Sequence, residues 1–171
     1  MTKPFWCQVN EQRLAQGDLL KQCLVPEFSP DYGTTTDPVT VGEYDLIIVT
    51  QSCDLENKKA SLVALCPIWT LPEFEDSSPD YKKRNQWENV RKGRVEGLHL
   101  LGSPSNPDEN RDALVVDFGQ IFSLPIAYLE KKSVDIGTRW RLDSPFLEHF
   151  SQAFARYFMR VGLPSTIPPF K

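Results

Sequence analysis

The chain has 171 residues, a hydrophobic fraction of 40% and a formal net charge of -4 at pH 7. This length suits one domain with a substantial core, and no apolar run approaches the ~20 residues that a membrane-spanning helix needs. The negative net charge argues against a protein that coats nucleic acid non-specifically. A local basic surface is still compatible with this net charge.

Cysteine and histidine usage argues against a metal site. The chain has only two histidines, and no two cysteines form a Cys-x-x-Cys pair. We therefore predict reduced thiols, no metal and no other cofactor. Residues 1–6 lack the apolar core of a signal peptide, which favours the cytoplasm without membrane association. The four cysteines are Cys7, Cys23, Cys53 and Cys66.

The first half of the chain predicts a strand followed by a central hairpin. Residues 17–20 (Gly-Asp-Leu-Leu) indicate a turn feeding a strand that runs to about Val25, and a loop rich in Pro, Gly and Thr follows over 26–42. The apolar run over 46–49, rich in β-branched residues, predicts a strand buried on both faces. A second apolar run over 62–68 follows a turn-like segment, so we expect a β-hairpin at the centre of the core.

The segment from 71 to 111 is richer in charged residues than the strands before it. An acidic stretch is followed by a basic one, and a helix is predicted from about 79 to 92. Ser78 as the N-cap, Pro79 at the first position and Gly93 after the last turn would bracket it. Residues 97–101 indicate a short strand.

The last third predicts more strands and a closing helix. Strands are expected over 113–118, 120–124, 127–129 and 138–142, with Gly119 and Pro125 as bulges or bends. Ser144 and Pro145 should start a helix that Gly162 ends. Its aromatic and aliphatic residues recur at three- and four-residue steps, which is typical of an amphipathic helix packed on a core.

The order of these elements resembles the MazF/PemK-like toxins, a family of small SH3-like β-barrels. The resemblance rests on four pieces of the chain: Gly17-Asp18-Leu19-Leu20, the two central strands with Cys66-Pro67-Ile68, the segment 114–120 and the closing helix. It implies a single α+β domain with a small, mostly antiparallel SH3-like β-barrel, a helical insertion and a C-terminal amphipathic helix. The barrel core would span about 16–70 and 112–142, the insertion 71–111 and the helix 144–162. Such toxins dimerise, so a homodimer is also implied.

The chain departs from that family where the chemistry is expected. Those toxins cut RNA with an Arg just before the central strand and a Thr or Ser just after the Pro-Ile pair. Here Glu43 and Tyr44 precede the strand, Trp69 follows the pair, and Thr70 comes one place later. The sequence therefore indicates a divergent member that lacks the expected catalytic Arg.

Cys53, Asp54 and His99 are the candidate catalytic residues. A nucleophilic thiol needs an exposed position and a neighbour that stabilises thiolate, commonly His. Cys53 follows the central strand and could pair with His99 if the 94–101 segment folds back over the sheet. The structural alternative makes Cys53 a half-buried turn residue, Asp54 a turn cap and His99, set among leucines, a packed edge residue.

A second set of residues is a candidate RNA- or ligand-binding site. Basic side chains with aromatic residues interleaved can hold phosphates and stack bases. The alternative is a solvated helix face. The candidate binding residues are Gln51, Ser52, Thr70, Trp87, Arg91, Lys92 and Arg94.

Two functions stay open at this level, and with them the question whether the protein is an enzyme. The first is a toxin-like barrel that acts as a binding or accessory module, for RNA or a partner protein, in a bacterial toxin or defence-type system. The second is a divergent endoribonuclease, or a Cys-dependent hydrolase that uses Cys53 with His99.

Overall fold

Strands and short helices alternate along the chain in the computed structural model, which describes residues 3–34, 38–57, 59–83 and 85–159. The strands are β1 (Trp6–Val9), β2 (Leu19–Glu27), β3 (Thr40–Ile48), β4 (Leu62–Thr70), β5 (Leu98–Leu101), β6 (Leu114–Asp117), β7 (Phe122–Pro125) and β8 (Arg139–Leu142). The helices are α1 (Ser52–Glu56), α2 (Leu71–Ser77), α3 (Gln86–Arg91), α4 (Ile126–Ile136) and α5 (Phe146–Phe158), with 3-10 turns η1 (Pro79–Lys82) and η2 (Asn110–Asp112).

The predicted central hairpin is confirmed: β3 and β4 pair antiparallel, with Ile47 opposite Cys66. The sheet order is β2-β3-β4-β6-β5. Strand β7 pairs with the first residues of β4, 62–65, whereas β6 pairs with its last residues, 68–70. The predicted bulge at Gly119 lies between β6 and β7, where the two strands pair in turn with β4. One correction concerns the hairpin connection, which contains the short helix α1 where a simple turn was expected.

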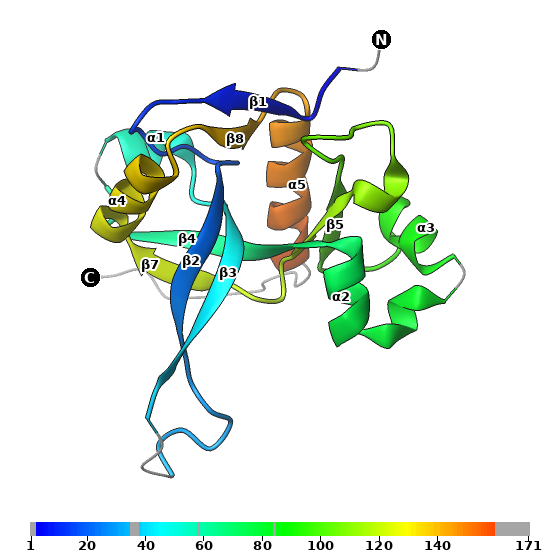
Figure 1. Ribbon diagram of the computed structural model, residues 1–171, viewed down its shortest axis with the longest axis horizontal. Helices are drawn as coiled ribbons and strands as arrows, with labels where there is room; N and C mark the ends of the chain where they lie inside the picture. Colours follow the sequence, from blue (N-terminus) through cyan, green and yellow to red (C-terminus); the bar gives the residue numbers. More distant parts are fainter. Residues whose placement is uncertain (1–2, 35–37, 58, 84, 160–171) are drawn as a thin grey trace, which may run out of the picture.

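The last three residues of the central strand β3, Leu46–Ile48, are buried on both faces, as the unbroken apolar run predicts. Ile47 belongs to a core cluster that includes Phe150 of α5, whereas Leu46 and Ile48 belong to a second cluster that includes Leu129 of α4. Successive side chains of a strand point to opposite faces. The sheet is therefore covered by α5 on one face and by α4 on the other (Figure 1).

Helix α5 confirms the predicted amphipathic helix, with Phe150 fully buried on its inner face. It begins one residue after Pro145, whose side chain makes no capping hydrogen bond, so Ser144 is not the cap. The helix ends at Phe158. The predicted stop at Gly162 lies outside the described residues.

Helix α4 corrects the prediction of a strand over 127–129. Leu129 and Ser133, one turn apart, are both buried, and Pro125 precedes the first turn. A three-residue apolar window is too short to distinguish a strand from the start of a helix. The helical spacing is visible only when the window extends to Ile136.

The predicted helix over 79–92 is wrong, because the segment breaks into η1 and α3. Asn85, between them, has a positive φ of 72° that interrupts any continuous helix. Gly93 follows α3 with a φ of +66°, as the predicted stop requires. Strand β5 pairs with β6, so part of the expected insertion 71–111 forms an edge of the sheet.

The described strands show no closed barrel. They form the open six-stranded sheet and a separate two-stranded sheet of β1 and β8, and all their pairings are antiparallel. The fold is therefore α+β with antiparallel sheets. In the described part of the chain, no helix is long and apolar enough to cross a membrane.

A buried ion-pair network joins residues 11–18 to β8. The carboxylate of Asp18, fully buried, accepts hydrogen bonds from Nε of Arg139 at 2.9 Å and from Nε and Nη2 of Arg141. Arg139 also donates to the carbonyl oxygens of Glu11 and Arg13, each at 2.6 Å. Asp18, which belongs to the Gly-Asp pair that predicts the start of β2, thus connects β2 to the distant strand β8.

Candidate functional site

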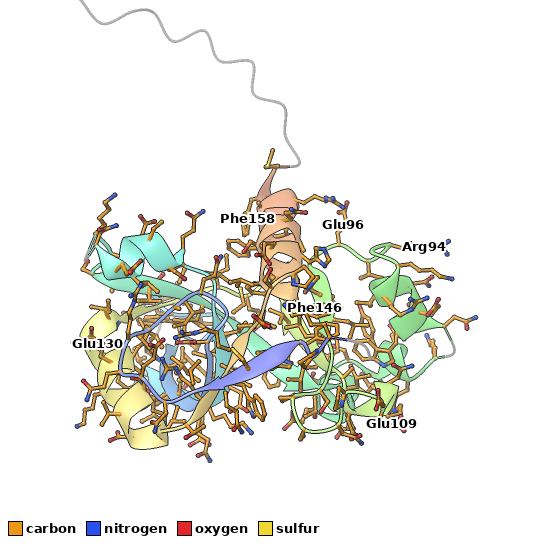
Figure 2. The ribbon with its side chains drawn as sticks, turned by 90° about the horizontal axis from the view of Figure 1, so that it is seen from above. Arg94, Glu96, Glu109, Glu130, Phe146 and Phe158 are labelled. Atoms are coloured by element: carbon orange, nitrogen blue, oxygen red, sulfur yellow. The ribbon has the colours of Figure 1, made fainter. Side chains whose placement is uncertain are left out.

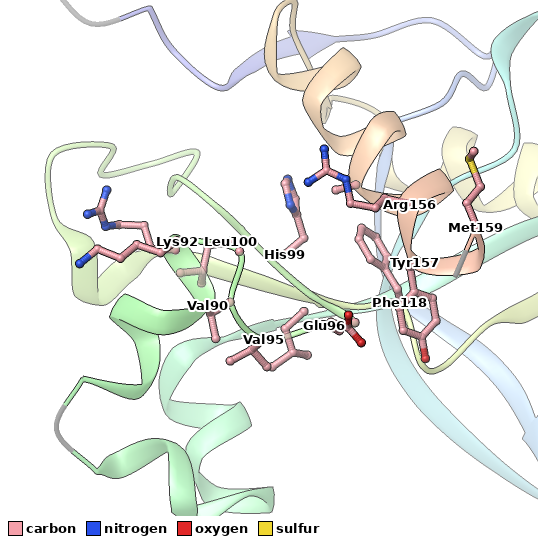
Figure 3. Close-up of a pocket in the computed structure, with 15 residues that line it drawn as sticks. Val90, Lys92, Val95, Glu96, His99, Leu100, Phe118, Arg156, Tyr157 and Met159 are labelled. Atoms are coloured by element: carbon pink, nitrogen blue, oxygen red, sulfur yellow. The ribbon is translucent and has the colours of Figure 1, made fainter. Parts of the chain in front are cut away.

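An open groove of about 590 Å³ lies between α3, β5 and α5 (Figure 3). β5 runs along the edge of the sheet and contributes His99, while the last turns of α5 contribute Arg156 and Tyr157. Lys92, just past the end of α3, lies on the opposite rim (Figure 3), and its neighbour Arg91 also lines the groove. The groove therefore combines an imidazole, three cations and aromatic rings, and it brings α5 against α3 and β5, from which it is distant in the sequence.

His99 is a neutral, partly buried imidazole in this groove. Its ring packs on Phe118 and Phe150, with centroid separations of 5.9 and 6.0 Å. Burial, and to a smaller extent the charge of the nearby His149, lowers the pKa of His99 to about 4. Among the described residues no side chain or backbone group hydrogen-bonds to the imidazole, so at neutral pH one nitrogen can donate to a ligand and the other can accept.

Arg156 supplies an exposed positive charge beside His99. The two side chains lie on the same side of the groove, with the guanidinium of Arg156 near the imidazole (Figure 3). Within the described part of the chain, no carboxylate lies within ion-pair distance of Arg156. Its donors can therefore meet an anionic group of a ligand without breaking an existing ion pair.

Arg91 and Lys92 share one carboxylate on the opposite rim. Arg91 Nε and Lys92 Nζ lie 2.7 and 2.9 Å from the Glu88 carboxylate, and their hydrogen bonds lower the pKa of Glu88 to about 2. Exposed pairs of this kind contribute little to stability, because water screens the two charges. The two cations can therefore turn towards a phosphate at small cost.

The aromatic wall of the groove depends on a close backbone approach. The Tyr157 ring lies 6.3 Å from that of Phe118, centroid to centroid. A Cβ on Gly97 would lie 3.1 Å from Cε2 of Tyr157, and Gly97 has a φ of +87°. Glycine at this position thus lets the ring of Tyr157 come close to the backbone just before β5.

Cys53 and His99 are not brought together. Cys53 is exposed on α1, where its Sγ lies 3.6 Å from Oε1 of Gln51 and 3.9 Å from Oδ1 of Asp54. α1 and β5 lie in different parts of the molecule (Figure 1). The thiol therefore has acceptors around it but no imidazole, because β5 pairs with β6 at the far edge of the sheet and does not fold over the central hairpin.

Three other candidate residues have structural partners. Ser52 Oγ accepts a hydrogen bond from the backbone N–H of Gln16 at 3.0 Å. Thr70 caps α2 in a reciprocal arrangement with Glu73, a capping box. Trp87 donates its indole N–H to Glu75 at 2.8 Å, and the same carboxylate pairs with Arg111.

The structure therefore brings only some of the predicted catalytic and binding residues together in the groove. His99, Arg91 and Lys92 line the groove, whereas Arg94 is exposed nearby without lining it (Figure 2). The candidates that lie outside the groove are Cys53, Asp54, Gln51, Ser52, Thr70, Trp87 and Arg94.

Arg156 and Tyr157 are the groove residues that sequence reasoning missed as a site. Tyr157 fits the apolar face of the C-terminal helix, whereas Arg156 lies away from that face. The periodicity of the helix therefore predicts a core contact for Tyr157 and a solvated position for Arg156. The sequence did not reveal that the neighbouring element carries His99.

Metal binding has no support in the described residues, where no three His, Cys, Asp or Glu side chains gather as ligands would. Comparisons with known proteins add no family: no model of a protein family matches the chain, and no curated protein matches it either. The resemblance to the MazF/PemK-like toxins therefore stays a prediction.

Proposed function

We propose that the protein is a binding module that holds a short stretch of single-stranded RNA in the groove between α3, β5 and α5. The observation that carries the proposal is the position of Arg156. It is a cation without an ion pair among the described residues, beside a neutral imidazole and an aromatic wall in one open groove.

Each part of the groove suits one part of a nucleotide. Arg156, with Lys92 and Arg91 on the opposite rim, can bind phosphate oxygens. Tyr157 offers a ring on which a base can stack, an interaction that tolerates any base. The neutral His99 can donate to and accept from a ribose 2′-OH, the group that distinguishes RNA from DNA. A volume of about 590 Å³ falls within the usual range of ligand sites.

Two observations favour binding over catalysis. A general base works best when its pKa lies near the working pH, and the pKa of His99, about 4, is far below neutrality. Cys53 has no histidine beside it to stabilise a thiolate. The thiol-dependent hydrolase is therefore the weaker proposal, and the ribonuclease would need a base other than His99.

We also propose that the fold is a divergent, incompletely closed SH3-like barrel of the toxin type, acting as an accessory module. An isolated bridge between Asp18 and Arg141 joins the β1–β8 pair to the start of β2. Trp6 on β1 donates its indole N–H to the carbonyl of Gly102, just past β5, at 2.7 Å. These contacts would close the circle of strands. Glu43 stands where the toxins have their catalytic Arg, which agrees with a lost nuclease site.

The test is the affinity of a fluorescently labelled single-stranded RNA, measured by anisotropy. Arg156→Ala should weaken binding about tenfold or more, since one charge-assisted contact contributes roughly 1.5–3 kcal/mol. The plot of log K against log salt should lose a slope of about 0.7 per phosphate contact removed. The matched control is Lys131→Ala, an exposed cation on α4, at the other end of the molecule from α3 (Figures 1 and 2).

Equal affinities for the Arg156→Ala and Lys131→Ala proteins would reject the proposal. RNA cleavage by the unchanged protein that persists in both His99→Gln and Cys53→Ala would favour a ribonuclease that uses another base. A DNA strand of the same sequence should bind more weakly, because it lacks the 2′-OH assigned to His99.

A further inference from the structure

A second surface, remote from the groove, is a protruding hairpin. β2 and β3 continue beyond the sheet as a two-stranded arm formed by residues 24–43, of which 35–37 lie outside the described part (Figure 1). Its inner side is braced, because Tyr44 donates to the Glu27 carboxylate across Gly42. A Cβ on Gly42 would overlap that carboxylate and the Tyr44 ring, so a larger residue there would displace both side chains. The hydrogen bond joins β2 to β3 on this side of the arm.

The arm carries a large share of the exposed apolar side chains. Leu24 and Val41 are 53% and 63% exposed, and they lie on one face because Leu24 is two residues from Pro26, which pairs with Val41. Towards the tip the large apolar side chains are exposed as well. Exposed apolar surface gathered in one place marks an interaction site more often than scattered residues do. The five residues of this arm patch are Leu24, Phe28, Tyr32, Val39 and Val41.

The outer edge of β2 is closed to a further strand. The backbone N–H of Leu24 donates to the hydroxyl of Tyr128 on α4 at 2.7 Å. Pro26, two residues on and facing the same way, has no N–H. Protected strand edges prevent uncontrolled pairing between chains. The arm therefore offers side chains, and not the backbone of β2, to a partner.

The negative charge of the arm favours a positively charged partner. Residues 22–57 contain seven Asp or Glu and no Lys or Arg, and four of the seven fall within 24–43. A second copy of this arm would bring like charges together, which opposes a symmetric arm-to-arm dimer. RNA and an anionic membrane surface are repelled for the same reason. A basic protein segment is attracted.

We propose that the arm patch docks a partner protein through a basic segment in which Lys or Arg alternates with large apolar residues. The apolar side chains of the segment would cover Leu24 and Val41, and its cations would face the surrounding carboxylates such as Glu43. This surface lies apart from the RNA groove and would let the module bind RNA and a protein together.

The experiment uses a labelled synthetic peptide of about ten residues with alternating Lys and Leu, long enough at ~3.3 Å per residue to run along β2. Anisotropy should report binding that weakens as salt rises. The double variant Leu24→Ser/Val41→Ser should lose about tenfold or more in affinity. The matched control is Leu62→Ser/Val134→Ser, at two residues of the same types that are 55% and 53% exposed outside the arm. Glu43→Lys should also weaken binding.

Four outcomes would overturn the proposal. One is no measurable binding of the peptide, and another is equal loss of affinity in the arm variant and the control. A third is equally tight binding of a peptide with alternating Glu and Leu. The fourth is a dimer in sedimentation that only the arm variant dissociates, which would make a second copy the occupant. Each leaves the RNA result untouched, because no variant here alters the groove.

Discussion

Two parts of the molecule use arginine in opposite ways. Arg139 is buried against β2 and donates to the carboxylate of Asp18 and to two carbonyl oxygens. Arg156 stands exposed at the groove and has no ion pair among the described residues. The residue type is the same, and the burial and the partners of the side chain differ. A guanidinium whose donors are all used holds the fold together, whereas one without partners is available to a ligand.

The same contrast separates the other candidates. Thr70 and Trp87 were plausible ligand contacts, yet each hydrogen-bonds a carboxylate of α2, Glu73 and Glu75. His99 has no such partner in the described residues. We interpret polar side chains that have hydrogen-bond partners within the protein as contributors to stability. We interpret those without such partners as candidates for contact with a ligand. The predictions below test this division, from the largest effect to the smallest.

The largest effect is expected from Asp18→Asn. Removing the shared charge leaves the guanidinium of Arg139 buried without a counter-ion, which costs about 3–5 kcal/mol of the free energy of unfolding. Urea unfolding followed by tryptophan fluorescence measures it. Arg156→Gln, at an exposed site, should change the same quantity by less than about 0.5 kcal/mol. Similar losses in both variants would refute the distinction between the two arginines.

An intermediate effect is expected from the pH dependence of His99. Its pKa is about 4 in the folded protein against 6.5 for an ordinary histidine, so the unfolded chain takes up a proton at a higher pH than the folded one. This contribution to stability is complete above pH 6.5 and is lost as the pH falls towards 4. The two pKa values differ by about 2.5 units, so at 1.36 kcal/mol per unit the full loss is about 3 kcal/mol.

The measurement compares urea unfolding at pH 7.5 and pH 4.5 for the unchanged protein and for His99→Gln. Acid-labile carboxylates act equally in both proteins, so their contribution cancels in the difference. The variant should lose less stability on acidification. Identical losses would mean that the imidazole is not buried in its neutral form.

The smallest effect is expected from Cys53→Ser, at a thiol that the comparison places outside any site. Stability and RNA affinity should stay within about 0.5 kcal/mol of the unchanged protein. The thiol itself should react quickly with iodoacetamide, since Cys53 is exposed. Burial raises the pKa of Cys23 to about 11 and that of Cys66 to about 12, so these two should react only after unfolding. Mass spectrometry of the alkylated peptides measures the order of reaction.

Strands with strong local patterns were predictable from the sequence. The run over 46–49 predicted a doubly buried strand because four consecutive apolar residues leave neither face for water, and β3 has that environment. The C-terminal helix was predictable because its apolar residues repeat at helical spacing. Weak patterns failed: residues 127–129 belong to a helix, and the helix over 79–92 is interrupted at Asn85.

The sequence by itself thus determined most of the strands, the central hairpin, the amphipathic closing helix and the residue types that could carry chemistry. Alternation, helical spacing and Pro or Gly at element ends all act within a few residues. Only the tertiary structure decided which of those residues meet. His99 and Arg156 share a groove, and Cys53 does not, because β5 pairs at the edge of the sheet next to α5. Such pairings are selected by the packing of the whole core, which no local pattern encodes.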